Sequence, residues 1–247
     1  INPGNQVLCA DSSTMSVVFN GSPQATVFNW SNNNTTIGLP ASGSGNIPSF
    51  TATNNSTAVQ TAQITVTPQF TNAGIVCFGP SQTFNISVNP TPNALATPTT
   101  QTICSGGSIT TIALSGNVSG TSYNWTRDNS ATVTGIPSNG SGNISGILTN
   151  TTNAPVTVTF TITPTANGCS GTAITAMVLV NPTPNAIANP TTQIICSGLS
   201  ITPIALTGNV PGTVYSWTRN NPGVTGMANS GTGNIAGTLV SNSLVPE

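Results

Sequence analysis

The stretch Val156-Thr-Val-Thr-Phe-Thr-Ile-Thr163 decides the fold, because its apolar residues and its threonines alternate strictly. Val156, Val158, Phe160 and Ile162 share one face of an extended chain, and the four threonines share the other. This alternation predicts a half-buried β-strand. After Pro164, the residues Thr-Ala-Asn-Gly-Cys favour a turn, and a second apolar stretch, Ala173–Val180, follows. The two stretches predict a hairpin that ends at an Asn-Pro step.

Shorter strands are predicted earlier in the same region. They cover Ile109–Leu114, Ser122–Thr126 and Ile144–Leu148, and residues rich in Gly, Asn and Ser separate them. Several short strands at this spacing predict an all-β sandwich.

The sequence repeats this unit almost three times. The segment 89–180 returns from Asn181 with the motifs Asn-Pro-Thr-Pro-Asn, Ile-Cys-Ser-Gly and Tyr-x-Trp-Thr-Arg, and a more diverged copy precedes both. One constant offset separates a cysteine from a tryptophan in each copy: Cys9 and Trp30, Cys104 and Trp125, Cys196 and Trp217. A fixed repeat means that one folding unit is copied in tandem.

We therefore predict three domains: a diverged repeat 1–88, a repeat 89–180 and a repeat 181–247. Ile1-Asn-Pro matches the Val-Asn-Pro steps at Val88 and Val180, so the chain is expected to start at a repeat junction. The third repeat stops before the counterpart of Val156–Val180, so we expect it to be incomplete and to lack the last hairpin.

The composition argues against several classes of function. The charged side chains of the 247 residues are Arg127, Arg219, Asp11, Asp128 and Glu247, and the sequence contains neither histidine nor lysine. Acid–base catalysis and metal binding need residue types that are nearly missing here, so we expect no enzyme, no catalytic residue, no cofactor and no metal site. Two arginines cannot neutralise a phosphate backbone, and no stretch approaches the roughly 20 apolar residues of a membrane-spanning helix. We expect neither nucleic-acid binding nor membrane insertion.

The tryptophans are the predicted core anchors. Trp30, Trp125 and Trp217 each follow an aromatic residue by two positions, so both rings of a pair face the same side of a strand. A surface platform for sugars would use the same residues, but one tryptophan per unit is better explained as the filling of the interior. The recurring glycines, as in Gly140-Ser-Gly-Asn, are expected to adopt backbone conformations that a Cβ disfavours.

The five cysteines are expected to form disulfides. We favour one bond inside each complete repeat, Cys9 with Cys77 and Cys104 with Cys169, while Cys196 would pair beyond the chain end. Equal spacing also allows bonds between neighbouring units, Cys77 with Cys104 and Cys169 with Cys196. Either pattern indicates an oxidising compartment outside the cytoplasm.

These motifs carry a family resemblance. Ile-Cys-Ser-Gly, Tyr-x-Trp-Thr-Arg, the Thr-Phe-Thr-Ile-Thr-Pro-Thr-Ala-Asn-Gly-Cys-Ser-Gly stretch and Val-Asn-Pro-Thr-Pro resemble the PKD-like domains of large Bacteroidota surface proteins. In the first repeat, Val76-Cys-Phe-Gly79 replaces Gly-Cys-Ser-Gly. The resemblance implies tandem immunoglobulin-like sandwiches in cell-surface or secreted proteins, often exported by the type IX system and associated with adhesion or gliding motility. It implies no catalytic residues.

Three functions compete. The first is a structural and adhesive stalk: an extended rod of β-sandwiches with proline-restricted joints, whose partners are neighbouring repeats or copies of itself. The second is a self-assembling extracellular filament, in which a strand from another chain completes the third repeat. The third is a carbohydrate-binding module that uses the threonine row Thr157, Thr159, Thr161 and Thr163 to contact surface glycans. Because the first repeat has Asn32 where the others have Arg127 and Arg219, we expect no essential role shared by all three repeats, and the two arginines are interpreted as local strand-end contacts.

Overall fold

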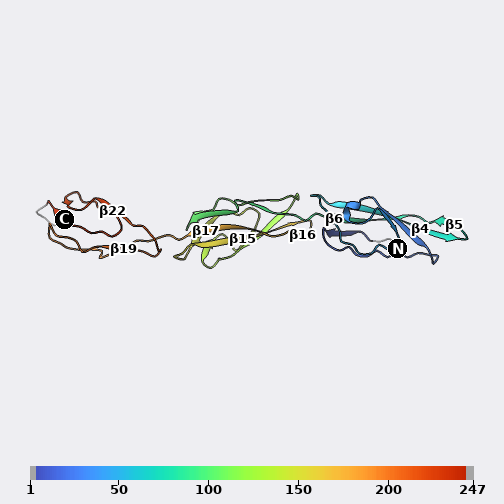
Figure 1. Cartoon of the computed structure of the whole chain (residues 1–247), viewed down its shortest axis with the longest axis horizontal. Helices are drawn as coiled ribbons and strands as arrows, with labels where there is room; N and C mark the ends of the chain where they lie inside the picture. The colour runs from blue at the N-terminus through green and yellow to red at the C-terminus, as the bar shows by residue number, and fades with distance from the viewer. Residues whose placement is uncertain (1–3, 243–247) are drawn as a thin grey trace.

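The structure is a computed structural model that describes residues 4–242, and the regular secondary structure within them is β-strand apart from one short 3-10 helix. Figure 1 shows the three repeats following one another along the long axis of the molecule, with the first repeat at the right and the third at the left. The Ile1-Asn-Pro step and Glu247 lie outside the described residues.

The first repeat is built on a six-stranded sheet in the order β1-β6-β4-β2-β3, with β5 paired to β4. β1 runs parallel to β6, and the other pairs are antiparallel. The elements are β1 (Gln6–Cys9), β2 (Val27–Asn32), the 3-10 helix η1 (Thr35–Ile37), β3 (Ser42–Ser44), β4 (Gln60–Asn72), β5 (Ile75–Phe78) and β6 (Gln82–Asn89). Segments bridged at Ser13–Thr51 and Val17–Ile47 face this sheet. The core between the two layers includes Trp30, Ile64 and Ile86.

The second repeat has the same main sheet, β13-β11-β15-β17-β8, with β16 paired to β15. Its strands are β7 (Leu95–Thr97), β8 (Thr100–Cys104), β9 (Gly107–Ser108), β10 (Ala113–Ser115), β11 (Ser122–Arg127), β12 (Val133–Gly135), β13 (Asn139–Ser141), β14 (Ile147–Asn150), β15 (Val156–Ala166), β16 (Cys169–Ser170) and β17 (Ile174–Asn181). The opposing layer consists of β12-β14-β9 and the pair β10-β7. This arrangement confirms an all-β sandwich.

The predicted hairpin of the second repeat is confirmed. β15 covers the alternating stretch, with Val158, Phe160 and Ile162 buried and the threonines between them more exposed. β17 pairs with it in antiparallel register, Phe160 opposite Ala176. The predicted strand Ile109–Leu114 is wrong in its bounds, because β9 ends before it at Ser108, Ile112 forms only an isolated bridge, and β10 begins at Ala113.

The described part of the third repeat forms three two-stranded sheets, β18-β19, β20-β22 and β21-β23. The strands are β18 (Ile187–Asn189), β19 (Ala205–Thr207), β20 (Ser216–Thr218), β21 (Val224–Thr225), β22 (Ser230–Thr232) and β23 (Val240–Ser241). Up to residue 242 there is no counterpart of β15 or β17. A hollow of about 570 Å³ lies where those strands pack in the second repeat, and its apolar lining includes Ile195, Trp217 and Leu239.

Candidate functional site at the junctions between repeats

A disulfide joins the first repeat to the second. Cys9 ends β1, which is parallel to β6 with Cys9 opposite Asn89, so its side chain lies at the end of the first sandwich that faces the second repeat. Cys169 begins β16, directly after the turn at Asn167 and Gly168. Positive φ values of 51° and 78° at these two residues fit the tight hairpin turns that Asn-Gly favours. The hairpin reaches back to the first repeat, and the Cα atoms of Cys9 and Cys169 are 5.6 Å apart.

This bond corrects the predicted pairings. Cys77, Cys104 and Cys196 are free and exposed, so neither the bonds within repeats nor the alternative pairs between neighbours form in this structure. The physical reason is that the two cysteines of one sandwich lie at opposite ends of it. Cys9 lies beside Asn89 at one end of β6, whereas Cys77 lies on the hairpin beyond the other end. A strand of this length separates them by about 23 Å at 3.3 Å per residue, and a disulfide requires Cα atoms within about 7 Å.

The linker of the first junction is packed beneath the same hairpin. Asn89, Pro90 and Pro92 are buried. The side-chain amide of Asn89 donates to the carbonyl oxygen of Asn167 at 2.9 Å, which ties the linker to the second repeat. Gly171 follows the hairpin, and a Cβ there would overlap the carbonyl oxygen of Pro92. The joint is therefore held by a covalent bond, a hydrogen bond and close packing.

The last asparagine of Asn-Pro-Thr-Pro-Asn has its own role. The backbone N–H of Asn93 donates to Oδ1 of Asn117 at 2.9 Å, and the N–H of Asn117 donates to Oδ1 of Asn93 at 2.8 Å. Asn185 and Asn209 repeat this reciprocal pair in the third repeat, at 2.8 and 2.7 Å. The pair anchors each linker to the repeat that follows it. The sequence repetition of these asparagines was the available signal, but their distant partners were not predictable.

The second junction is more open than the first. Asn209 donates to Oδ1 of Asn153 at 2.9 Å across it. A hollow of about 440 Å³ lies between the two repeats and is lined mainly by Pro155, Pro182, Pro184, Val210 and Pro211. Pro182 is buried, as Pro90 is, but Pro184 is exposed where its counterpart Pro92 is buried.

Arg127 and Arg219 have a role that all three repeats share. Nε of Arg127 donates to the carbonyl oxygen of Ile136 at 2.7 Å, and Arg219 reaches the equivalent carbonyl of Met227 at 3.2 Å through Nη2. In the first repeat the shorter Asn32 donates to the carbonyl of Leu39 at 2.9 Å. The local contact at the strand end is thus confirmed, and the inference that Asn32 argues against a shared role is wrong. Burial lowers the pKa of Arg127, an effect that the carboxylate of Asp128 opposes.

The three predicted core anchors lie on the inward faces of their strands. Trp30 and Trp125 are 8% and 7% exposed, and Trp217, beside the hollow of the third repeat, is half-buried. The Trp125 ring meets Phe160 edge to face, with centroids 5.7 Å apart. Gly140 also lies against the indole, and a Cβ there would overlap it. Stacking on a sugar needs an open ring face, which Trp125 does not offer.

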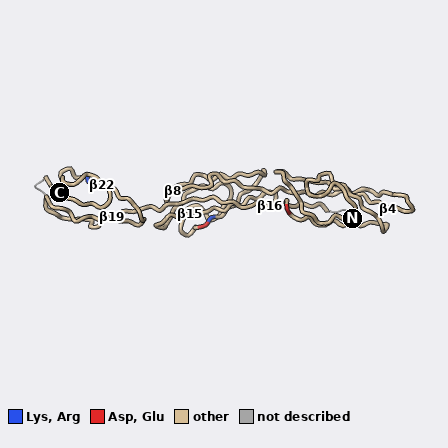
Figure 2. Tube along the Cα trace, in the orientation of Figure 1, with Lys and Arg blue, Asp and Glu red and all other residues tan. Residues whose placement is uncertain are grey.

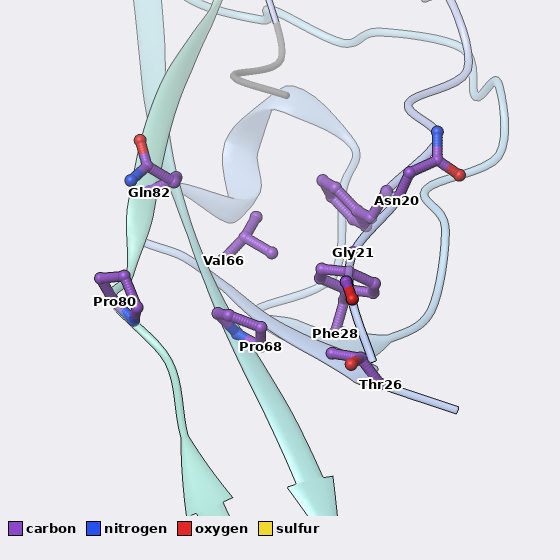
Figure 3. A pocket seen from close by; sticks show the side chains of 10 residues that line it. Asn20, Gly21, Thr26, Phe28, Val66, Pro68, Pro80 and Gln82 are labelled. Atoms are coloured by element: carbon purple, nitrogen blue, oxygen red, sulfur yellow. The ribbon is translucent and has the colours of Figure 1, made fainter. Parts of the chain in front are cut away.

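Two surface hollows are candidates for ligand binding. One, of about 450 Å³, lies beside the threonine row and is lined by Asn124, Thr126, Ser141, Thr161 and Thr163 among others. The other, of about 430 Å³, lies in the first repeat, where Figure 3 shows Phe28, Val66 and Pro68 around it and Asn20 at its edge. The side chains that line both are uncharged.

Charge is sparse along the whole described chain, as Figure 2 shows. Between residues 4 and 242, no three side chains of the His, Cys, Asp and Glu types gather closely enough to hold a metal ion. The same residues include no helix with the length and apolar character needed to cross a membrane.

Part of this chain is similar to a known domain family, and the chain aligns with solved structures at low sequence identity. A comparison with curated proteins finds no sequence match. Among solved structures, mouse cadherin-23 EC22-24 is 10% identical, with a TM-score of 0.44, and the alignment covers 98% of this chain and 86% of that one. Human CDH23 EC21-23 is 14% identical, with a TM-score of 0.45 and 97% and 98% coverage. Residues 101–184, which span most of the second repeat, match the model of the PKD-like domain.

Proposed function

We propose that this chain is a non-catalytic structural and adhesive repeat region of an extracellular cell-surface protein. It acts as a stalk that holds an attachment function away from the cell, in a system of the gliding or adhesin kind exported by the type IX route. The PKD-like match of the second repeat supports the class of repeat. The observation that carries the proposal is the first junction, where a disulfide and a buried linker join two sandwiches end to end.

A stiff joint is what a stalk needs. A flexible linker lets successive domains fold back on one another, whereas proline-restricted, packed linkers hold them apart. The uncharged exterior rich in Thr, Asn and Ser adds a second property, because it lacks the charge repulsion that discourages association between copies. We therefore infer that copies of the chain bind one another side by side.

The stalk is tested by small-angle X-ray scattering and by attachment. The chain is expected to scatter as one extended particle, and a Cys9→Ser/Cys169→Ser variant is expected to sample a wider range of overall sizes. Beads coated with the chain are expected to bind a surface coated with the same chain. A compact particle would contradict the stalk, and the absence of bead binding would contradict the adhesive part.

A strand-completed filament is the second candidate. The hollow of the third repeat, lined by Ile195, Ile201 and Ile204 among others, has the apolar character of a groove that accepts a strand from another chain. In the second repeat β15 pairs with β11 and β17 pairs with β8. A peptide of residues 156–181 carrying Cys169→Ser is therefore expected to protect the amides of their counterparts, β20 and residues 192–196, from hydrogen exchange. A peptide with threonine in place of Val158, Phe160 and Ile162 is the control, and equal protection by both would exclude specific completion.

Glycan binding is the third candidate, and the hollow beside Thr161 and Thr163 favours it. A glycan array probed with the chain and with a Thr161→Val/Thr163→Val variant tests whether this hollow binds glycans. Loss of a signal in the folded variant would support glycan binding, and an unchanged signal would exclude this surface.

A further inference from the structure

We infer that Cys104 is one half of a second inter-repeat disulfide, whose other half is the hairpin cysteine of a complete repeat placed after the second. In an array of such repeats, the end of each sandwich would then be bonded to the hairpin of the next. This inference does not rest on the adhesive function. It rests on the positional equivalence of the free cysteines to the two that are bonded.

Cys104 occupies the position of Cys9. It ends β8, which is parallel to β17 with Cys104 opposite Asn181, just as Cys9 ends β1 opposite Asn89. The next backbone hydrogen bond is also the same. Ser105 N–H donates to the Asn181 carbonyl at 2.8 Å, and Ala10 N–H donates to that of Asn89 at 2.9 Å. The thiol of Cys104 is therefore placed at the end of the second sandwich that faces the following repeat.

The hairpin cysteine of the inter-repeat disulfide, Cys169, also has a counterpart in the first repeat. Cys77 pairs across the strands with Phe70, the counterpart of the Cys169 pair with Ala166. Two residues later in each hairpin, a glycine N–H donates to a proline carbonyl, Gly79 to Pro68 at 2.9 Å and Gly171 to Pro164 at 3.0 Å. The first repeat thus presents the same cysteine at the same place in its ladder. The two strands of its hairpin are longer, and Ile75 and Phe78 beside Cys77 are 70% and 69% exposed.

Burial separates the bonded cysteine from the free ones. Cys169 is 2% exposed, whereas Cys77 and Cys104 are exposed. Asn89 is buried by its contact with the hairpin of the second repeat, while its counterpart Asn181 is only half-buried. The second junction therefore leaves Cys104, Asn181 and Pro184 accessible to a hairpin of the kind that covers the first.

The bond forms by thiol–disulfide exchange. Two thiols lose two protons and two electrons to become one disulfide, and a disulfide oxidant of the extracytoplasmic compartment accepts these as it is reduced to two thiols. The residues of β17 that pair with β8, Met177–Asn181, are all uncharged. The proximity of the two thiols, rather than an activating charge, therefore selects the pair.

The test supplies a complete repeat after the second. In one variant, a copy of residues 90–181 replaces residues 182–247, so that the second repeat is followed by its own complete copy. In another, a copy of residues 157–181 is fused after Glu247. Both are produced in an oxidising compartment, free thiols are alkylated, and peptides are mapped without reduction. In both variants Cys104 is expected to leave the pool of free thiols and to appear bonded to the copy of Cys169.

Matched variants make the result decisive. Replacing the copied cysteine with serine is expected to return Cys104 to the alkylated pool while leaving the Cys9–Cys169 bond intact. Hydrogen exchange over the copied strands shows whether the added repeat has folded. Alkylated Cys104 beside a folded following repeat would overturn the inference, as would a bond between the copied cysteine and any other residue. The first variant keeps the test valid if the third repeat of the second variant does not fold, because its added repeat is a complete one.

Discussion

The side chain of Asn150 joins two segments of the second repeat by donating to the carbonyl oxygens of Val180 and Ala154, at 2.9 and 2.7 Å. Its own oxygen accepts from the N–H of Thr152 at 2.8 Å. Asn54 makes the same set in the first repeat, to Val88 at 2.7 Å and Ala58 at 2.8 Å. These hydrogen bonds fix the end of β17 against the loop after β14, immediately before the linker that leads to the next repeat.

Asn150→Ala is expected to lower the free energy of unfolding of the second repeat by about 1–3 kcal/mol, because the buried carbonyl of Val180 loses its side-chain donor. Asn54→Ala is expected to have the same effect in the first repeat. Urea titration followed by tryptophan fluorescence measures the change. Asn124→Ala, at an exposed position on β11, is the control and is expected to stay within about 0.5 kcal/mol of the parent. Equal effects of Asn150→Ala and Asn124→Ala would show that the hydrogen bonds of the Asn150 side chain do not contribute to the free energy of unfolding.

A second prediction concerns the glycine that packs against each core tryptophan, which is the first residue of Gly43-Ser-Gly-Asn-Ile47 and of Gly140-Ser-Gly-Asn-Ile144. Gly43→Ala and Gly140→Ala are each expected to destabilise their repeats by about 1–3 kcal/mol, because the added methyl group overlaps the indole of Trp30 or Trp125. Thermal unfolding with near-ultraviolet circular dichroism reports both stability and tryptophan packing. Gly4→Ala is the matched control, since nothing lies within 4 Å of a Cβ there. Unchanged stability of Gly140→Ala would mean that the tryptophan can move aside at no cost.

The features that local pattern determines were predictable from the sequence. The alternation of Val158, Phe160 and Ile162 predicts the strand and its buried face, because side chains alternate across any strand. The disulfide was not predictable, because it depends on which end of a sandwich each cysteine occupies. The parallel pairing of β1 with β6 sets that position, and parallel pairing between strands so distant in sequence leaves no local signal. The role of Asn150 was equally unpredictable from local sequence. Its Asn-Thr-Thr pattern matches a glycosylation sequon, but its side-chain amide is buried and hydrogen-bonded to the carbonyl oxygen of Val180.

Arg127 provides a third prediction. Arg127→Ala is expected to destabilise the second repeat by about 1–3 kcal/mol, because the carbonyls of Ile136 and Pro137 lose their donor. The stability of Arg127→Lys is expected to lie between that of the parent chain and that of Arg127→Ala, since an ammonium group cannot reproduce the planar guanidinium fork.

Hydrogen exchange of the Ile136 amide, which donates to Ile147 at 3.2 Å, reports the loop directly and is expected to accelerate in Arg127→Ala. Thr126→Ala, on the exposed face of the same strand, is the control. If Ile136 exchanges at the parent rate in Arg127→Ala, the arginine does not hold this loop.

Mechanical unfolding tests the disulfide between the first two repeats. The bond links residues 160 positions apart, so a force applied at the two ends of the chain passes from Cys9 directly to Cys169 and bypasses the residues between them. At about 3.3–3.6 Å per extended residue, the bypassed segment corresponds to roughly 550 Å of contour length. Pulling single molecules under oxidising conditions is therefore expected to release about 550 Å less than pulling after reduction. The Cys9→Ser/Cys169→Ser variant is expected to give the long extension under both conditions, and Cys77→Ser the short extension when oxidised. A long extension of the oxidised parent chain would mean that the two repeats are not covalently joined.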